Sequence, residues 1–289
     1  MLSAGPTGIV KLGEHVKRGT YRVTFSKTIT RSGREIGPGQ EYIMSGAHFW
    51  YYYLNAAQAI ECYEKLDPEK GPYDGIESGP CVVIGCGPSL KDFPFEVLKG
   101  WDCIVCNRAH EWVPWAKYFL TMDYGAFIES PDQGKRLRQF KQLVFTKIGG
   151  GAIHPKAVEF PWPSKTPMVS DSIAEGMHGR HSGMAAVNLA YCLGYGPIYF
   201  LGIDCKVDYE SNPEGRPHFY NEETEKLRKY IMRPVDGYTA ERLSTWRRMF
   251  DCQARQYRFR GVEVINLGPN SALQRFEKRD WQEVLRCNI

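Results

Sequence analysis

Residues 81–90 read CVVIGCGPSL, an apolar run that passes directly into a turn with two glycines. Four apolar residues bounded by turn residues are typical of an interior strand of a parallel sheet. Gly85 and Gly87 have access to backbone angles that other residues avoid, and they let main-chain N–H groups approach a ligand closely. A helix that starts just after the turn would add unpaired N–H groups and the positive end of its dipole. The stretch therefore predicts a phosphate-bearing ligand above the carboxyl end of this strand.

A nicotinamide-dinucleotide site is the obvious interpretation of such a turn, but the neighbouring residues fit it badly. Leu90 stands where that fingerprint needs a third glycine. The next apolar run ends in Asn107 and Arg108 rather than in the acidic residue that binds an adenosine ribose. Because short glycine motifs are weak evidence, a tight connection between strand and helix without any ligand stays open as the alternative.

Apolar runs recur after residue 79 and alternate with helical patterns. They lie at Cys81–Ile84, Asp102–Cys106, Tyr118–Met122, Leu143–Lys147, Ile198–Leu201 and Val262–Asn266. This alternation predicts an α/β fold with a Rossmann-like, mostly parallel sheet and flanking helices. The carboxyl ends of parallel strands meet at one edge of the sheet, so we expect Asn107, Asp123 and Asp204 around the same crevice as the two glycines.

The first quarter of the chain follows another pattern. Apolar and polar residues alternate between Tyr21 and Phe25, which predicts a strand, and Ser32–Gly33 is a plausible hairpin turn. Residues 46–66 carry an apolar stripe at helical spacing. We therefore expect an accessory β element plus a helix over residues 1–78, and a nucleotide-binding catalytic domain over residues 79–289.

A long stretch rich in glycine and proline covers residues 149–180, and such loops are more often functional than accidental. Ser182 follows as a suitable N-cap of a helix that ends at Gly194. The N–H groups at the start of this helix, including that of Gly183, and a bidentate guanidinium at Arg180 would suit a phosphate or a carboxylate. The alternative for Arg180 is an exposed surface charge.

The segment from about residue 205 to residue 238 is polar and interrupted by prolines, which predicts a mobile lid. After it comes a helical pattern with a basic face formed by Arg242, Arg247, Arg248, Arg255 and Arg258. Such a face can contact nucleic acid, although a solvated helix face is commoner. A DNA-associated, nucleotide-binding module is therefore one alternative function.

The composition narrows the functional classes that remain possible. The 289 residues carry a net charge of +4, which permits an anionic substrate without requiring nucleic acid. Nine scattered cysteines, several within apolar runs, favour a reducing, cytoplasmic compartment. The start of the chain lacks the pattern of a signal peptide, and no apolar run is long enough to span a membrane. A homo-oligomer stays open as an alternative to a monomer.

Several separated motifs occur in a recognisable order. They are GCGPSLK at 85–91, CN at 106–107, RHSG at 180–183, LGY at 193–195, IYFLGID at 198–204 and PNS at 269–271. Together they resemble the small, metal-independent bacterial sialyltransferases that use a CMP-activated sugar. They are equally similar to the family of archaeal hydroxymethylpterin pyrophosphokinases and of the motility-associated factors that modify flagellin. The resemblance covers roughly residues 81–273.

The resemblance implies roles for the matching positions. The nucleotide-phosphate turn would consist of Gly85, Gly87, Pro88 and Ser89. The nucleotide and the donor's carboxylate would lie against Asn107, Arg180, Ser182, Gly183, Asn270 and Ser271. Lid tyrosines would steady the leaving phosphate and a lid histidine would be the base, which makes Tyr209, Tyr220 and His218 the candidates. Cys86 and His181 depart from the sialyltransferase pattern, which has asparagine and threonine there, and the lid spacing differs too.

The leading hypothesis is transfer of a sugar from a nucleotide-activated donor to an acceptor hydroxyl. His218 would take the proton, since the ordinary pKa of histidine is close to working pH, and no metal or cofactor would be required. The acceptor is open between a glycan, a protein and a modified DNA base. The second hypothesis is ATP-dependent pyrophosphate transfer to a pterin-like alcohol. That reaction would use Mg²⁺ held by Asp123 and Asp204.

Overall fold

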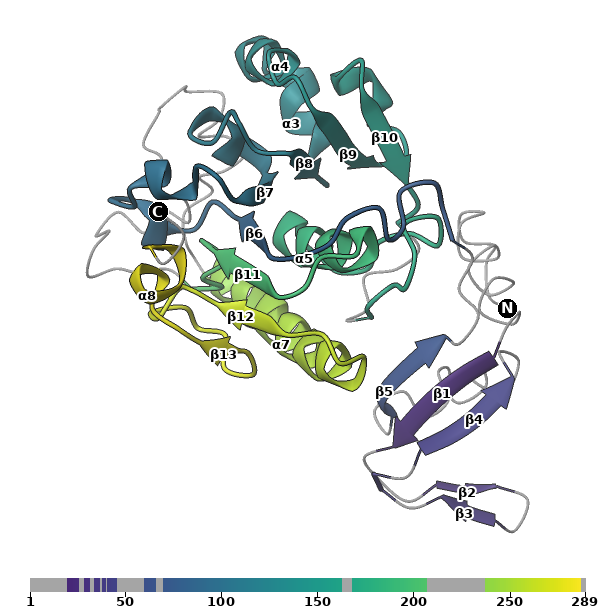
Figure 1. Ribbon diagram of the computed structural model, residues 1–289. Coiled ribbons are helices and arrows are strands. Elements are labelled where there is room, and N and C mark those ends of the chain that lie inside the picture. The colour runs from purple at the N-terminus through teal and green to yellow at the C-terminus, as the bar shows by residue number, and fades with distance from the viewer. Residues whose placement is uncertain are drawn as a thin grey trace.

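The computed structural model of the 289-residue chain describes residues 20–25, 29–31, 34–36, 38–39, 41–45, 60–65, 70–162, 168–206 and 237–286. Its main feature is an eight-stranded sheet in the order β10-β9-β8-β7-β6-β11-β12-β13 (Figure 1). All pairs of neighbouring strands in it are parallel. The predicted α/β fold with a mostly parallel sheet is therefore confirmed.

The strands have the following bounds: β6 Cys81–Ile84, β7 Asp102–Cys106, β8 Tyr118–Thr121, β9 Leu143–Lys147, β10 Ala157–Phe160, β11 Ile198–Leu201, β12 Val264–Asn266 and β13 Glu277–Lys278. From β6 the chain builds the sheet outward through β7 to β10, and it then returns to place β11 on the other side of β6. The strand order thus reverses between β6 and β11. Doubly wound sheets bind their ligands at such a reversal, outside the carboxyl ends of the strands.

Alternating residues of each strand enter two separate cores. In β6, Cys81 and Val83 pack on one face of the sheet, whereas Val82 and Ile84 pack on the other. The first face is covered by α5 (Ser182–Leu193) and α7 (Gly237–Phe259), and the second by α3 (Tyr124–Glu129), α4 (Pro131–Arg138) and α8 (Trp281–Leu285). Apolar burial on both faces explains why these strands are continuous apolar runs.

The connections on the second face are shorter than the sequence pattern indicates. Only 3-10 turns link β6 to β7, namely η2 (Pro88–Leu90) and η3 (Phe95–Leu98), and only η4 (Asn107–Glu111) links β7 to β8. The helix expected immediately after the glycine turn is therefore wrong. Pro88 and Pro94, close together in the chain, restrict the backbone and remove N–H donors that a longer helix would use.

Residues 149–180 hold more regular structure than the predicted loop. The edge strand β10 and the turn η5 (Gly151–Ile153) lie in this segment. Its later part is held by Asp171, which pairs with the buried Arg260 of the region after α7 at 2.6 Å. Asp74 accepts hydrogen bonds from the Ile173 N–H and the Ser172 hydroxyl. The backbone that leads into α5 is thus fixed from two sides.

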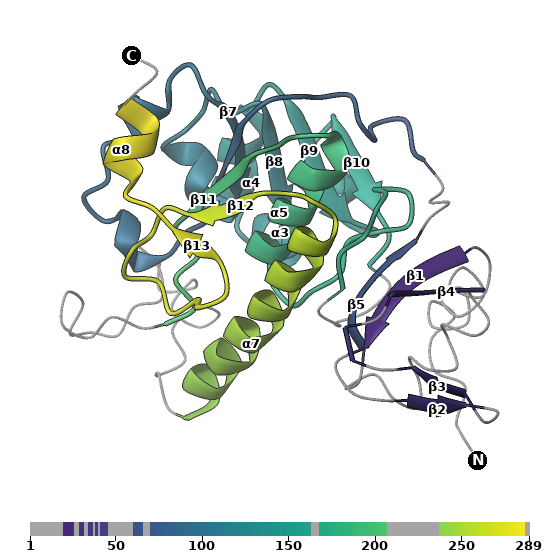
Figure 2. The same cartoon turned by 60° about the horizontal axis from the view of Figure 1, so that its bottom comes forward.

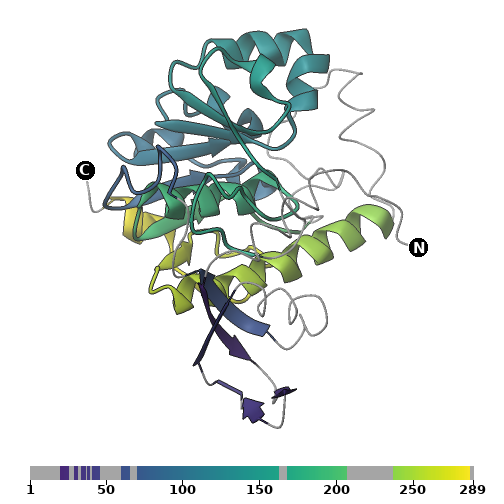
Figure 3. The ribbon, with the colours of Figure 1, turned by 90° about the vertical axis from the view of Figure 1, so that its right-hand side faces the viewer.

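The N-terminal β element is a three-stranded sheet in the order β4-β1-β5, with the hairpin β2-β3 beside it. Its bounds are β1 Thr20–Phe25, β2 Ile29–Arg31, β3 Arg34–Ile36, β4 Glu41–Ser45 and β5 Ile60–Lys65. Arg31 pairs with Arg34, which confirms the predicted hairpin pairing of the two strands, and Ser32 and Gly33 themselves lie outside the described residues. This element lies apart from the main sheet and beside α7, which β5 contacts (Figures 2 and 3).

The helix predicted over residues 46–66 is wrong for its last part. Residues 60–65 form β5, which pairs antiparallel with β1. Residues 46–59 lie outside the described part of the chain. The apolar spacing that suggested a helix there is overridden by pairing with a strand about 40 residues earlier. Within the described residues no helix is long and apolar enough to cross a membrane.

Candidate functional site

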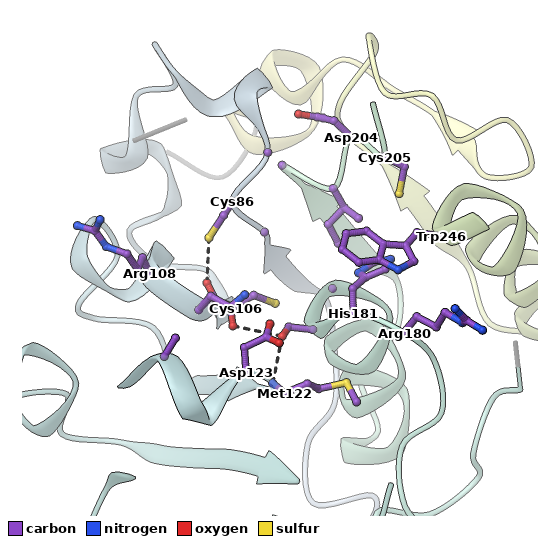
Figure 4. A pocket seen from close by; sticks show the side chains of 18 of the residues that line it. Cys86, Cys106, Arg108, Met122, Asp123, Arg180, His181, Asp204, Cys205 and Trp246 are labelled. Carbon is purple, nitrogen blue, oxygen red and sulfur yellow. Dashed lines mark hydrogen bonds between the residues drawn. The ribbon is translucent and has the colours of Figure 1, made fainter. Parts of the chain in front are cut away.

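A cavity of about 810 Å³ opens at the carboxyl edge of the sheet (Figure 4). The ends of β6, β7, β9 and β11 line it, together with α3 and the start of α5 and α7. In Figure 4, Cys86, Cys106 and Asp123 lie on one side of it, and His181, Trp246 and Cys205 on the other. The cavity therefore occupies the crevice that the reversal of strand order predicts.

The glycine turn after β6 is packed directly against the end of β11. A Cβ atom on Gly85 would lie 2.3 Å from the Gly202 carbonyl oxygen, and one on Gly87 would lie 2.3 Å from Oδ2 of Asp204. Neither glycine has a positive φ angle. Glycine is required here because two backbone segments come into contact, so the expected need for unusual backbone angles is wrong.

The N–H groups of this turn already have partners within the protein. Gly85 donates to the Leu201 carbonyl at 2.8 Å, and Gly87 donates to the Gly202 carbonyl at 2.7 Å. Asp204 accepts from the Ser89 N–H at 2.9 Å and, through its other oxygen, from the Ser89 hydroxyl at 2.8 Å. The carboxylate of Asp204 thus takes the place next to the turn that the sequence assigns to a ligand phosphate.

A second loop holds the Asp204 segment from behind. The Ala272 N–H donates to the Asp204 carbonyl at 2.8 Å, and the Ser271 hydroxyl donates to the Ile203 carbonyl at 3.1 Å. Ser271 is buried and Asn270 is exposed, and neither belongs to the residues that line the cavity. The structure therefore places the PNS motif behind the site rather than in it.

Asn107 follows β7 with a left-handed backbone, φ 50°. Its Oδ1 accepts from the Thr121 hydroxyl at 2.7 Å and from the Ser182 hydroxyl at 3.2 Å, and Ser182 accepts from the Met122 N–H. These bonds connect the ends of β7 and β8 to the start of α5. They leave the Asn107 Nδ2 amide without a hydrogen-bond partner among the described residues, on the wall of the cavity. A non-glycine residue held in this backbone region is a pointer to a functional site.

The start of α5 is capped by His181 rather than by the predicted Ser182. Nδ1 of His181 accepts from the Met184 N–H at 3.3 Å, so its Nε2 carries the proton. Nε2 is buried and has no hydrogen-bond partner among the described residues, and the ring lies against Trp246 with the centroids 5.1 Å apart. Burial lowers the pKa of His181 to about 3, which keeps the imidazole neutral at working pH. His181 thus lines the cavity as a neutral ring that caps α5, and its Nε2–H is closed off from solvent by the packing around it.

Basic side chains outnumber acidic ones around the cavity. Among the described residues, Arg108, Lys147, Arg180, Lys206 and Arg242 line it, against Asp123, Glu129 and Asp204. Arg108 is paired with Glu111 at 2.6 Å, and Arg242 lies over the Trp246 ring at 5.8 Å. Arg180 is exposed and forms no ion pair with a described residue. This excess of positive charge suits an anionic ligand.

Three cysteines lie at the cavity wall. The Cys86 thiol donates to the Cys106 carbonyl at 3.3 Å, and burial raises the pKa of Cys86 to about 12. Burial likewise raises the pKa of Cys205 to about 12. A nucleophilic thiolate is therefore disfavoured at these positions. Cys86 fills space under the turn in place of the asparagine of the sialyltransferase pattern.

The structure brings together nine of the sequence-predicted residues at the cavity wall: Gly85, Gly87, Pro88, Asn107, Asp123, Arg180, Ser182, Gly183 and Asp204. Ser89, Asn270 and Ser271 do not line it. Tyr209, His218 and Tyr220, with most of the predicted lid, lie outside the described residues. Their catalytic roles stay predictions.

A magnesium site on Asp123 and Asp204 would need a rearrangement. Asp123 is exposed at the cavity and forms no ion pair with a described residue, so it is open to a cation. Asp204 would have to give up its two hydrogen bonds to Ser89. No group of three metal-binding side chains occurs in the described part of the chain. The role of Mg²⁺ stays a prediction.

Several lining residues were not predicted as site residues from the sequence. The most informative are Tyr124, Lys147, Trp162, His181 and Trp246. Lys147 is the last residue of β9, and the rule that gathers strand ends at one edge could have found it. Trp162 and Trp246 carry no such signal, because aromatic residues at these spacings are typical of a core.

Comparisons with known proteins do not establish a family. No model of a protein family matches the chain, and no curated protein matches its sequence. Among solved structures, the fold is similar to that of a MAf glycosyltransferase from Magnetospirillum magneticum AMB-1, with a TM-score of 0.45 and 12% sequence identity. The similarity covers 76% of this chain and 37% of that one, so this chain spans well under half of that protein.

Proposed function

We propose that the protein transfers a sugar from a nucleotide-activated donor to an acceptor hydroxyl. The observation that carries the proposal is the cavity at the reversal of strand order, whose wall presents donors that the protein itself does not use. These are the Asn107 amide and the Arg180 guanidinium. Donors held in place before the reaction stabilise charge that develops on a leaving phosphate.

The donor would lie across the ends of β6 and β7. The Asn107 amide, held by Thr121 and Ser182, would orient the nucleotide, since two hydrogen bonds fix the rotamer of its side chain. Arg180 would add a full positive charge at the bond that breaks. His218 remains the candidate base for the acceptor hydroxyl.

The test is nucleotide binding measured by calorimetry and thermal shift. CMP, UDP, GDP and ATP are each added with and without Mg²⁺, because a ligand that binds only the folded state raises its melting temperature. We expect one nucleotide to stabilise the protein without metal, and Asn107→Ala to weaken its binding at least tenfold. Lys135→Met is the control, since Lys135 is exposed on α4 away from the cavity.

A second assay measures release of free sugar from the matching nucleotide-sugar, because water can take the place of the acceptor hydroxyl. Absence of binding by all four nucleotides would overturn the proposal. Binding of ATP that depends on Mg²⁺ and on Asp123 would instead support pyrophosphate transfer. Steeply salt-dependent binding of duplex DNA, lost on neutralising the arginines of α7, would support the DNA-associated module.

A further inference from the structure

Lys147 ends β9 at the wall of the cavity and lies between two aromatic rings. Its Nζ is 5.3 Å from the centroid of the Tyr124 ring and 4.6 Å from that of the Trp162 ring. Its ammonium group forms no ion pair or hydrogen bond with a described residue. Aromatic faces attract an ammonium group but supply no oxygen acceptor for its three N–H donors. The charge is thus held in place while its hydrogen bonds are left for a ligand.

Both rings are anchored by the fold. Gly149 and Gly150 pack against Tyr124, since a Cβ on either residue would lie 2.9 Å from an atom of that ring or its hydroxyl. The segment 149–151 is itself fixed, because the Glu159 carboxylate accepts hydrogen bonds from the N–H groups of Gly149 and Gly151 at 2.9 and 2.7 Å. Such close packing leaves the Tyr124 ring little room to move.

Trp162 is fixed from the other side of the cavity. Its Nε1–H donates to the Gly179 carbonyl at 3.0 Å, and Gly179 has a φ of 113°, which favours glycine. The next residue is Arg180, another cation at the cavity wall without an ion-pair partner among the described residues. Lys147 and Trp162 therefore extend the basic wall of the cavity toward β9 and β10.

This part of the cavity is well separated from the glycine turn. β9 is the third strand along from β6, so at about 4.8 Å per strand the two ends are roughly 14 Å apart. With the nucleoside held at Asn107 and the phosphates at Arg180, as in the proposed function, the sugar or the acceptor would extend toward Lys147. The position of Lys147 thus concerns the part of the substrate that is not the nucleotide.

We propose that Lys147, held between Tyr124 and Trp162, binds a carboxylate or phosphate group of the substrate at the end of the cavity opposite the glycine turn. The assignment of this group to sugar or acceptor rests on the proposed function. The substrate then carries two anionic parts, the nucleotide phosphates and a second anion beyond them. A neutral hexose at that place would leave the ammonium without a charged partner.

The experiment compares probes that differ in one anionic group. For the donor, UDP-glucuronate is compared with UDP-glucose. For the acceptor, glucuronate and glucose 6-phosphate are compared with glucose, each with and without the best nucleotide found above. Binding is measured by calorimetry and saturation-transfer NMR for the wild type, Lys147→Met, Lys147→Arg and the exposed control Lys135→Met. Nucleotides alone are measured in the same series.

We expect the wild type to prefer a charged probe about five- to tenfold over its neutral counterpart. Lys147→Met should lose that preference but bind the free nucleotide normally, and Lys147→Arg and Lys135→Met should keep it. A preference for UDP-glucuronate over UDP-glucose assigns the anion to the donor. A preference for glucuronate or glucose 6-phosphate over glucose assigns it to the acceptor.

The proposal is overturned if the wild type shows no charge preference, or if Lys147→Met retains it. Normal nucleotide binding in that case leaves the proposed function intact. Conversely, a charge preference that depends on Lys147 in a protein that binds no nucleotide would support the anion site and reject the glycosyltransferase. The two failures are thus distinguishable.

Discussion

The two sides of the cavity use their polar groups in opposite ways. At the glycine turn, the N–H groups of Gly85, Gly87 and Ser89 all donate to oxygens of the β11 segment. At the ends of β7 and β9, the Asn107 amide and the Lys147 ammonium have no hydrogen-bond partner among the described residues. The turn thus behaves as a structural joint, and the opposite side offers the groups that a ligand needs. A glycine turn at a strand end is therefore not by itself a phosphate site.

The largest effect is expected from Gly85→Ala, because its Cβ would lie 2.3 Å from a backbone oxygen that cannot turn away. Separating β6 from β11 should lower the free energy of unfolding by about 3 kcal/mol. Urea denaturation measures it. Gly125→Ala is the control, since the nearest atom to its Cβ is 3.9 Å away within α3, where alanine stabilises a helix by up to ~1 kcal/mol. Equal stability of the two variants would contradict the role of the glycine turn in holding β6 against β11.

A smaller loss is expected from Asp204→Asn. The amide keeps one oxygen but loses the charge that strengthens both bonds to Ser89. The free energy of unfolding should fall by about 1–2 kcal/mol, and Ser89→Ala should lower it by about 1 kcal/mol. A double-mutant cycle between the two positions measures their coupling. Strict additivity would mean that the carboxylate does not hold the turn.

Two substitutions at Asn107 separate the contribution of its backbone from that of its side chain. Asn107→Gly accepts φ 50° freely, whereas Asn107→Ala does not, so the alanine variant should be less stable by about 1 kcal/mol. Both variants should lose nucleotide binding to the same extent, because both lack the amide. Thermal unfolding and calorimetry are measured on the same samples. Wild-type affinity in Asn107→Gly would show that the backbone alone forms the site.

The effect that is smallest at neutral pH concerns protonation, and it grows only as the pH falls below about 6.5. Burial lowers the pKa of His181 to about 3, so the unfolded chain binds a proton below about pH 6.5 that the folded protein does not bind until near pH 3. Stability should therefore fall as the pH falls through this window. His178, with a pKa lowered to about 4 by burial, contributes in the same direction. His181→Asn should reduce the slope of stability against pH by up to one proton, and an unchanged slope would contradict the assignment.

The sequence predicted the interior of the sheet better than its edges. The bounds of β6, β7, β9 and β11 match the apolar runs, because strands buried on both faces need only local hydrophobicity to be recognised. Edge strand β10 contains the polar residue Glu159, whose carboxylate accepts a hydrogen bond from a neighbouring loop. The sequence pattern of this strand therefore predicts a loop rather than a strand. Strand β5 depends on pairing with β1, which no local period reveals.

The site was predicted in part. Strand-end polar residues such as Asn107 and Asp204 follow from topology, and the structure places both at the cavity. The hydrogen-bond partner of Asp204 does not follow from topology. It is Ser89 of the same chain, a residue distant in sequence that only the folded sheet brings close. His181 was noted as a departure from a family pattern, but its buried Nε2 depends on Trp246 of another helix.

The joint between β6 and β11 also sets the order in which the protein can mature. Ser89 and Asp204 are 115 residues apart, and the loop that supports Asp204 comes later still, at Ser271 and Ala272. During synthesis, β6 to β10 leave the ribosome before the residues that close their cavity exist. The closing of so long a loop is slow and depends on contacts made at the end. Ligand-binding competence should therefore arise as the last event of folding, after the nascent chain has passed residue 272.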